Sequence, residues 1–283
     1  MTDWLNRCHF GDCVETMRRM PGGIVQACVT SPPYFGLRDY GHAGQIGQEA
    51  TPTAFVAKMV EVFREVRRVL RDDGTLWLNL GDSYGTGKQL LGIPWRVAFA
   101  LQEDGWILRQ DIIWSKPNPM PESATDRCSK AHEYIFLLSK SRNYRFDSDA
   151  IREAQSEASL KRYKYSFNKA EQNTDGSAGY LSTKRGTEKT EVKPNVQGRN
   201  RRTVWTVATK PYKGAHFATF PPALIEPCIL AGAPPGGVVL DPFFGSGTTG
   251  QVAIQHARQF IGCELNPEYE PLQARRLQQP PLL

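Results

Sequence analysis

The sequence has no long apolar segment: none of its runs approaches the ~18–20 residues that a membrane-spanning helix needs. It also lacks a Cys-x-x-Cys pair and a histidine cluster at zinc-ligand spacing, so its six cysteines predict neither a metal site nor a disulfide framework. The first residues, Met1-Thr2-Asp3-Trp4, carry no signal-peptide pattern. These absences predict a protein of the reducing cytoplasm with no membrane span and no bound metal.

Excess positive charge is confined to one segment. The formal net charge is +6, and residues 151–203 hold 12 Lys and Arg against 6 Asp and Glu, whereas the remaining residues are balanced at 23 of each sign. The segment has few aliphatic residues and cannot build a core of its own. Two interpretations fit it: a solvated loop, or a basic insertion that contacts nucleic-acid phosphates.

A proline pair ends the first apolar run. Residues 24–29 predict a strand, and Ser31-Pro32-Pro33-Tyr34 follows it directly. Neither proline can donate to a sheet ladder, so the strand must stop there with a stiff backbone. A hydroxyl, a rigid carbonyl and an aromatic ring at one strand end suit a flat ring with an exocyclic amine, that is, a nucleobase. The alternative is a strand-ending turn with a packed tyrosine.

A glycine loop follows a second apolar strand near the end of the sequence. Residues 237–240 precede the loop, and Gly245, Gly247 and Gly250 satisfy G-x-G-x-x-G. Such glycines let the backbone turn tightly and approach a ligand, while helix N–H groups face a negative group. The competing interpretation is a nicotinamide dinucleotide site with Glu264 on the ribose. Residues 251–283 are too few for the further strands that such a fold would place after its fingerprint, so we disfavour a dehydrogenase.

In this order the two motifs resemble the amino-methylating DNA methyltransferases of the β class, in which S/D-P-P-Y precedes an F-x-G-x-G cofactor loop. The resemblance covers nearly the whole chain. Its supporting segments are Gly11-Asp12-Cys13, 73–80, 113–118, 216–221, 241–250 and Glu264. Residues 31–41 also resemble phage and prophage methylases that lack a partner nuclease, which implies a bacterial or phage-infected bacterial cell.

The resemblance implies S-adenosyl-L-methionine as the cofactor. The residues that it and the glycine loop nominate for cofactor binding are Asp12, Thr30, His216, Phe217, Asp241, Pro242, Phe243, Gly245, Ser246, Gly247, Thr248, Thr249, Glu264 and Asn266. Within this set, the helix beginning near Thr248 offers N–H groups to the methionine carboxylate. Glu264 would take the ribose hydroxyls. As alternatives to cofactor binding, Asp12 could cap a helix and Asp241 could shape the loop.

The predicted catalytic residues are Ser31, Pro32, Pro33 and Tyr34. The Ser31 hydroxyl and the Pro32 carbonyl would accept the two amine N–H bonds and localise the nitrogen lone pair, and Tyr34 would stack on a base flipped out of double-stranded DNA. With these motifs present, we favour DNA contact for the basic segment. The candidate DNA-binding residues are Arg38, Lys116, Lys161, Arg162, Lys164, Arg199, Arg201 and Arg202.

The acceptor base stays open between two amines. Within the resembled family, serine at the first motif position favours cytosine N4, with adenine N6 as the alternative. A protein that binds without turnover is disfavoured by the intact motifs. Cys228 follows a proline, as the nucleophile of carbon-5 methylation does. It falls in an apolar helical run, however, and this context predicts that its side chain is buried in the core. The recognition sequence, a restriction partner and the choice between monomer and homodimer are left open.

The predicted fold is α/β: a Rossmann-like S-adenosylmethionine-dependent methyltransferase fold with a mostly parallel sheet, helices on both faces and circularly permuted motif order. One predicted helix covers residues 53–70 and is ended by Asp72-Asp73-Gly74. A second covers residues 94–102, with Trp95, Ala98 and Phe99 facing inward. Predicted strands include 75–80, 107–114 and 133–138. The expected organisation is a catalytic part (1–150), a basic target-recognition insertion (151–203) and a cofactor-binding part of the same domain (204–283).

Overall fold

The computed structural model describes residues 3–39, 41–42, 44–158, 198–209 and 220–278. The chain divides into two units, one formed by Met1–Ala150 with Arg202–Leu283 and the other by Ile151–Arg201. The first unit contains both sequence motifs. It therefore holds the fold that positions the candidate site.

Within the described residues, eight strands form one sheet in the order β1-β8-β7-β2-β3-β5-β4-β6. The strands are β1 Arg7–Phe10, β2 Val25–Thr30, β3 Leu70–Leu80, β4 Ile107–Ser115, β5 His132–Ser139, β6 Val204–Thr206, β7 Val238–Asp241 and β8 Gln259–Glu264. All neighbouring pairs are parallel except β3 with β5 and β4 with β5. The mostly parallel sheet predicted from the sequence is confirmed.

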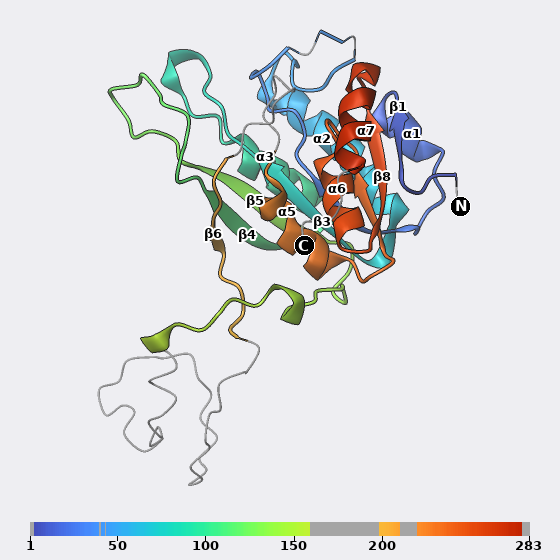
Figure 1. Cartoon of the computed structure of the whole chain (residues 1–283). Coiled ribbons are helices and arrows are strands. Elements are labelled where there is room, and N and C mark those ends of the chain that lie inside the picture. The colour runs from blue at the N-terminus through green and yellow to red at the C-terminus, as the bar shows by residue number, and fades with distance from the viewer. Residues whose placement is uncertain (1–2, 40, 43, 159–197, 210–219, 279–283) are drawn as a thin grey trace. The chain divides into compact units, whose positions relative to one another are not determined.

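Helices cover both faces of the sheet (Figure 1). From the adjacent strands β2 and β7 the chain proceeds outward in opposite directions, to β3 and to β8. Right-handed crossovers then place the intervening helices on opposite faces. One group is α1 Cys13–Arg18, α2 Pro52–Val69 and α3 Ile93–Glu103, and the other is α5 Pro222–Gly232, α6 Thr248–Gln255 and α7 Glu270–Leu277. Short 3-10 turns span Thr86–Lys88, Asp149–Ile151 and Pro267–Tyr269.

Helix α2 supplies much of the core of the first unit. Thr51 caps its first turn by accepting from the Ala54 N–H at 3.1 Å, and Pro52 occupies the first position, where no N–H is needed. Phe55, Met59 and Phe63 then recur on one face and are fully buried. Replacing Phe55 or Phe63 with alanine would cost about 3–5 kcal/mol of stability.

Two expectations about the elements were wrong in detail. Strand β3 begins at Leu70, directly after α2, because it pairs in parallel with β2 from that residue onward. Phe99 is 51% exposed, and α3 instead buries Val97 and Leu101. Strand β5 is antiparallel because the segment 116–131 contains no crossover helix, so the chain returns directly beside β4. The short strands β1 and β6 were not predicted.

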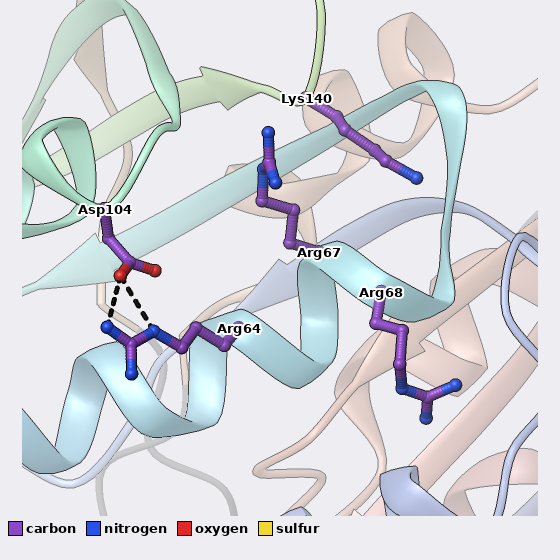
Figure 2. Close-up of a pocket in the computed structure, with 5 residues that line it drawn as sticks. All are labelled: Arg64, Arg67, Arg68, Asp104 and Lys140. Atoms are coloured by element: carbon purple, nitrogen blue, oxygen red, sulfur yellow. Dashed lines mark hydrogen bonds and ion pairs between the residues drawn. The ribbon is translucent and has the colours of Figure 1, made fainter.

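A surface cleft of about 510 Å³ lies at the edge of the sheet where the parallel strands begin. Arg64, Arg67, Arg68, Asp104 and Lys140 line it (Figure 2). Its charges are largely paired: Arg64 with Asp104 at 2.5 Å, Arg68 with Glu65 at 2.8 Å and Lys140 with Asp72 at 3.0 Å. Because ligands of open α/β sheets bind at the opposite, carboxyl edge of the strands, this cleft is not the candidate site.

Candidate active site

The two motifs meet at the carboxyl edge of two neighbouring strands. Strands β2 and β7 pair in parallel, with Ala27 opposite Val239 and Cys28 opposite Leu240. The proline pair leaves the end of β2, and the glycine loop leaves the end of β7. The Thr30 hydroxyl donates to the Asp241 carboxylate at 2.6 Å, across 211 residues of sequence. This is the point where the strand order reverses, which is the usual ligand site of such a sheet.

Asp241 joins three segments at this point. Besides Thr30, its carboxylate accepts from the Thr249 hydroxyl at 2.6 Å and from the Phe243 N–H at 3.0 Å. The side chain is 2% exposed, and burial raises the pKa of Asp241 to about 6. These bonds give Asp241 the loop-shaping role. Cofactor contacts of Thr30, Asp241 and Thr249 stay predictions, since their polar side-chain atoms bond one another in this structure.

The glycine loop presents an open helix end. Gly245 and Gly247 have φ values of 52° and 88°, in the left-handed region that favours glycine. Gly247 is the N-cap of α6 and provides no side-chain cap, so the N–H groups of the first turn lack that partner. A Cβ on Gly250 would lie 2.7 Å from the Phe244 ring, so the third glycine lets α6 pack closely against the loop that precedes it.

Glu264 caps the same loop from the end of β8. Its carboxylate accepts from the Gly245 N–H at 2.7 Å and from the Asn266 N–H at 2.9 Å, and burial raises the pKa of Glu264. Each oxygen keeps a further acceptor position for a ribose hydroxyl. The Gly11 N–H donates to the Glu264 carbonyl at 2.8 Å, which brings Asp12 to this edge.

Several nominated residues have structural partners as well. Asp12 caps α1 by accepting from the Glu15 N–H at 2.9 Å. The Asn266 side chain caps the 3-10 turn that follows it, accepting from the Glu268 N–H at 2.9 Å. Pro242 is buried and Phe243 half-buried. His216 and Phe217 lie outside the described residues, so their placement is untested.

Two residues of α7 support the glycine loop and were not predicted. The Gln273 amide donates to the Gly245 carbonyl at 2.7 Å, and the Arg276 guanidinium donates to the Thr248 hydroxyl. Both side chains are almost fully buried, at 3% and 5% exposure. Polar residues three apart on a short charged helix normally indicate a solvent-facing side, so the sequence offered no signal for them.

This part of the site fits a carboxylate-bearing cofactor. The Ser246 hydroxyl is buried and has no hydrogen-bond partner among the described residues. It lies in the loop that ends at the uncapped start of α6. Open helix N–H groups together with an unsatisfied hydroxyl favour a negatively charged group there. The donor set therefore suits the carboxylate end of a bound amino acid.

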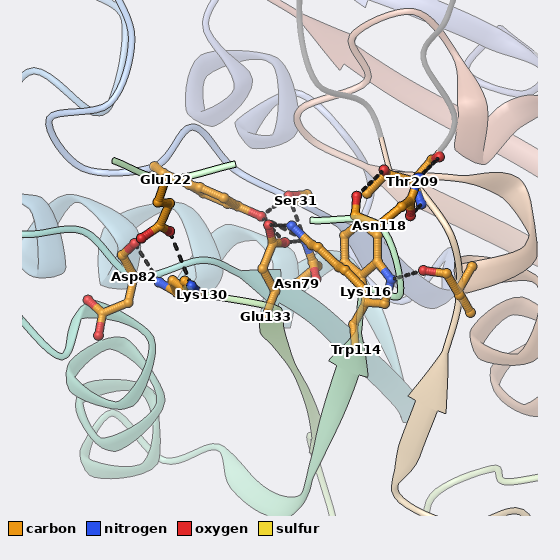
Figure 3. A network of polar contacts seen from close by, with 12 residues as sticks. Ser31, Asn79, Asp82, Trp114, Lys116, Asn118, Glu122, Lys130, Glu133 and Thr209 are labelled. Atoms are coloured by element: carbon orange, nitrogen blue, oxygen red, sulfur yellow. Dashed lines mark hydrogen bonds and ion pairs between the residues drawn. The ribbon is translucent and has the colours of Figure 1, made fainter. Parts of the chain in front are cut away.

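A second polar cluster surrounds the proline pair (Figure 3). The Tyr34 hydroxyl donates to Glu133 at 2.5 Å, and the Asn79 amide nitrogen lies 3.1 Å from the Ser31 hydroxyl and 2.9 Å from that of Tyr34. Lys116 forms an ion pair with Glu133. A Cβ on Gly81 would lie 2.4 Å from the Tyr34 ring, so only glycine leaves room for it.

Asn79 and Glu133 were not predicted as site residues. Asn79 is 3% exposed in β3. A polar residue inside this otherwise apolar strand needs hydrogen-bond partners, and this could have identified Asn79 as a site residue from the sequence. Glu133 lies near the start of β5, opposite Trp114. It reaches the site only because β5 runs antiparallel, which places its first residues at the carboxyl edge of β3.

The candidate DNA-binding residues are distributed over both units. Lys116 lies 4.4 Å over the Trp114 ring as well as beside Glu133. Arg38 is half-buried, and Arg199 pairs with Glu153 at 3.4 Å. Arg201 is half-buried and Arg202 exposed. Lys161, Arg162 and Lys164 lie outside the described residues.

Residues 25–275 match the family model of the N6/N4 methylases, described as DNA methylase. The chain belongs to the N6/N4 DNA methylase family. It is 47% identical to the Type II methyltransferase M.Cfr9I of Citrobacter freundii over 95% of this chain and 86% of that protein. It is 44% identical to M.SmaI of Serratia marcescens over 94% of this chain and 89% of that one.

Solved structures of DNA methyltransferases share the fold. The PvuII DNA methyltransferase, described as cytosine-N4-specific, superposes with a TM-score of 0.71 at 21% identity, covering 98% of this chain and 87% of that one. A putative DNA modification methylase from Thermus thermophilus, complexed with S-adenosyl-L-methionine, gives 0.63 at 24% identity, covering 96% of each chain. This DNA methyltransferase has the Rossmann-like methyltransferase fold, and its cofactor is S-adenosyl-L-methionine.

None of the helices described is both long and apolar enough to cross a membrane. In the same part of the chain, no group of three or more His, Cys, Asp and Glu residues is arranged to hold a metal ion. Cys228 is 1% exposed inside α5, as its apolar context predicted.

Proposed function

We propose that this DNA methyltransferase modifies the exocyclic N4 amine of cytosine at a specific site in double-stranded DNA. The observation that carries the proposal is the 2.6 Å hydrogen bond between Thr30 and Asp241, because it joins the strand that ends just before Ser31 to the strand that bears the glycine loop. Serine at position 31 favours cytosine N4. The cytosine-N4-specific PvuII methyltransferase, which shares the fold, supports the same choice.

The proposed role of the proline pair follows from the weak nucleophilicity of an exocyclic amine. The amine lone pair is delocalised into the ring, and acceptors for its two N–H bonds draw it back onto nitrogen. The Ser31 hydroxyl and the Pro32 carbonyl are the proposed acceptors, held ready before the base arrives. S-adenosylmethionine, when bound, would supply a methyl group on positively charged sulfur, and the electrons of the C–S bond would stay with sulfur when the methyl group is transferred to the amine. The amine then loses one proton to solvent.

The base must leave the duplex to reach this site. Flipping costs a few kcal/mol. Stacking on Tyr34 would recover about 1–3 kcal/mol of that cost. Tyr34 is suited to this role because Gly81 gives its ring room and Glu133 and Asn79 hold its hydroxyl. The ring therefore needs no reordering when the base enters.

The proposed cofactor site is the edge formed by the glycine loop, β8 and β1. The first-turn N–H groups of α6 and the Ser246 hydroxyl would hold the methionine carboxylate, and Glu264 the ribose hydroxyls. Asp12 is the proposed partner of the adenine amine, and Phe243, His216 and Phe217 would pack against the remaining cofactor surface. No residue of the Ile151–Arg201 unit is needed for this binding.

The proposed DNA contacts come from the basic segment 151–203 and from loops at the carboxyl edge. In this organisation 1–150 and 204–283 form the methyltransferase domain, and 151–203 recognises the target. Arg38 and Lys116 are the proposed contacts from the domain itself. Arg199, Arg201 and Arg202, with Lys161, Arg162 and Lys164, are those from the inserted segment and its border.

Mass spectrometry of nucleosides tests the proposal directly. DNA incubated with the wild-type protein and cofactor should yield N4-methylcytosine, and Ser31→Ala should yield far less under the same conditions. N6-methyladenine alone would reassign the acceptor to the alternative amine while keeping the mechanism. 5-Methylcytosine would exclude amine methylation and point to a cysteine nucleophile.

A further inference from the structure

A serine hydroxyl that accepts from an amine must send its own hydrogen elsewhere. Hydroxyls both donate and accept, so the Ser31 oxygen can face a base in either sense. If Ser31 pointed its hydrogen at the amine, two donors would meet and the lone pair of nitrogen would gain nothing. The neighbours of Ser31 decide which sense is present.

The cluster around the proline pair forms a chain of hydroxyls with one direction. Ser31 is within 3.5 Å of the Tyr34 hydroxyl, which in turn donates to Glu133 at 2.5 Å. An ionised carboxylate only accepts, so Tyr34 must point its hydrogen at Glu133 and leave its oxygen to Ser31. Burial and the Glu133 charge raise the pKa of Tyr34 well above its ordinary value, which keeps the phenol protonated.

Asn79 and Lys116 lock this direction. The Asn79 amide nitrogen lies 3.0 Å from Glu133 and also reaches both hydroxyl oxygens, so it can only donate into the chain. Lys116 carries donors alone and pairs with the second oxygen of Glu133. The Glu133 and Lys116 side chains are 12% and 18% exposed, so water competes little for these contacts.

We propose that Glu133 is a positioning residue that fixes the hydroxyl chain of Tyr34 and Ser31 so that Ser31 presents an acceptor to the target amine. The proposal rests on the proposed function of Ser31 as an amine acceptor. It extends that function, because the site would select an N–H donor over a carbonyl at the flipped base through a carboxylate that never contacts the base.

Glu133→Gln is the variant that separates direction from shape. The glutamine has nearly the same volume, but Lys116 can only donate and so draws the amide oxygen toward itself. The amide nitrogen then faces Tyr34 and turns the phenol hydrogen back toward Ser31. Ser31 in turn presents a donor to the base. Tyr34→Phe is a second variant, since it removes the link between Ser31 and Glu133 and leaves the ring.

The first test compares binding to cytosine and to uracil at the target position of one duplex, with S-adenosylhomocysteine present. Uracil carries a carbonyl in place of the amine. The wild-type protein should prefer cytosine, and the cytosine-to-uracil affinity ratio should fall about 10-fold in Glu133→Gln. The cost of flipping each base is common to both proteins and cancels between them. An unchanged ratio in both Glu133→Gln and Tyr34→Phe would overturn the proposal.

The second test is a double-mutant cycle on the methylation rate. Glu133→Gln should slow turnover by roughly 10–100-fold in the wild-type background and by less than about 2-fold in Ser31→Ala, because Glu133 acts through Ser31. Independent, multiplying losses would contradict this role and leave the proposed function standing. A Ser31→Ala variant with undiminished turnover would instead refute the proposed function itself.

Glu122→Gln is the matched control. Glu122 lies in the 116–131 segment that precedes β5 and pairs with Arg127, outside the hydroxyl chain. It should keep the wild-type affinity ratio and turnover. Calorimetric affinity for S-adenosylhomocysteine should be the same in all variants, since the contacts of the glycine loop are unaltered. If Glu122→Gln changed the affinity ratio as much as Glu133→Gln does, the loss of a negative charge would explain the effect, and the proposed hydrogen-bond direction would be refuted.

Discussion

Replacing Asp241 with asparagine should remove a dependence of stability on pH. Burial raises the pKa of Asp241 from 3.8 to about 6, with the nearby Glu264 charge adding to the effect. The folded chain therefore holds this proton more tightly than the unfolded chain. That contribution is fully present below the unfolded pKa and is lost as pH rises toward the folded pKa. A difference of about two pKa units corresponds to about 3 kcal/mol.

The assay is urea unfolding of both proteins, followed by circular dichroism at steps between pH 4 and 7.5. Other groups titrate in both proteins, so the difference between their free energies of unfolding isolates Asp241. Between pH ~4 and ~6, the free energy of unfolding of the wild type should fall by up to about 3 kcal/mol relative to that of Asp241→Asn. Above this range, the difference between the two proteins should be constant. A difference that is flat throughout, or that rises in favour of wild type, would refute the buried carboxylate as described.

Thr30→Val sharpens this test. The Thr30 hydroxyl donates to Asp241 at 2.6 Å and lowers its pKa against the effect of burial. Removing that donor should extend the pH window of the stability loss above pH 6. Thr53→Val, at an exposed position of α2, is the control and should leave the window in place. Equal windows in the two variants would show that the Thr30 bond does not stabilise the ionised carboxylate.

Three further predictions follow from the site. Ser31→Ala should slow methyl transfer by roughly 10–1000-fold with unchanged calorimetric cofactor affinity, and a weakened cofactor affinity would argue for a structural role. Gly81→Ala should reduce turnover strongly while the chain stays folded by circular dichroism, because its Cβ would meet the Tyr34 ring at 2.4 Å; normal turnover would mean that the ring position is unimportant. If about five cations of the basic segment contact phosphate, DNA affinity should fall with log salt at a slope of about −4 to −5, and neutralising Arg199, Arg201 and Arg202 should reduce that slope by up to ~3. Deletion of 156–196 without effect on slope or methylated sequence would make the segment a linker.

The sequence was informative where one residue type has one physical use. Paired prolines had to end a strand, and the glycines at 245 and 247 were expected to let the backbone turn tightly, which they do with left-handed φ values. The spacing of apolar residues in α2 needed no tertiary information either. These local rules predicted both loops of the candidate site, and the alternation of helices and strands, together with the family resemblance, predicted the mostly parallel sheet.

What the sequence could not supply depends on topology. Glu133 reaches the Ser31 and Tyr34 hydroxyls only because β5 is antiparallel, and no direction was assigned to this strand from the sequence. Gln273 and Arg276 are ordinary surface residues by pattern and are buried only where α7 packs on the glycine loop. Asp241 was nominated for the cofactor, whereas its partners Thr30 and Thr249 come together through the pairing of β2 with β7.

The most direct test of the central claim is a crystal structure of the protein with S-adenosylhomocysteine and a duplex that contains its target. We expect a cytosine flipped out of the duplex, with its N4 nitrogen about 2.7–3.2 Å from both the Ser31 hydroxyl and the Pro32 carbonyl. The sulfur of the cofactor should lie on the other side of that nitrogen, beside the glycine loop. A base that stays stacked, or an amine held by other residues away from Ser31, would contradict the account.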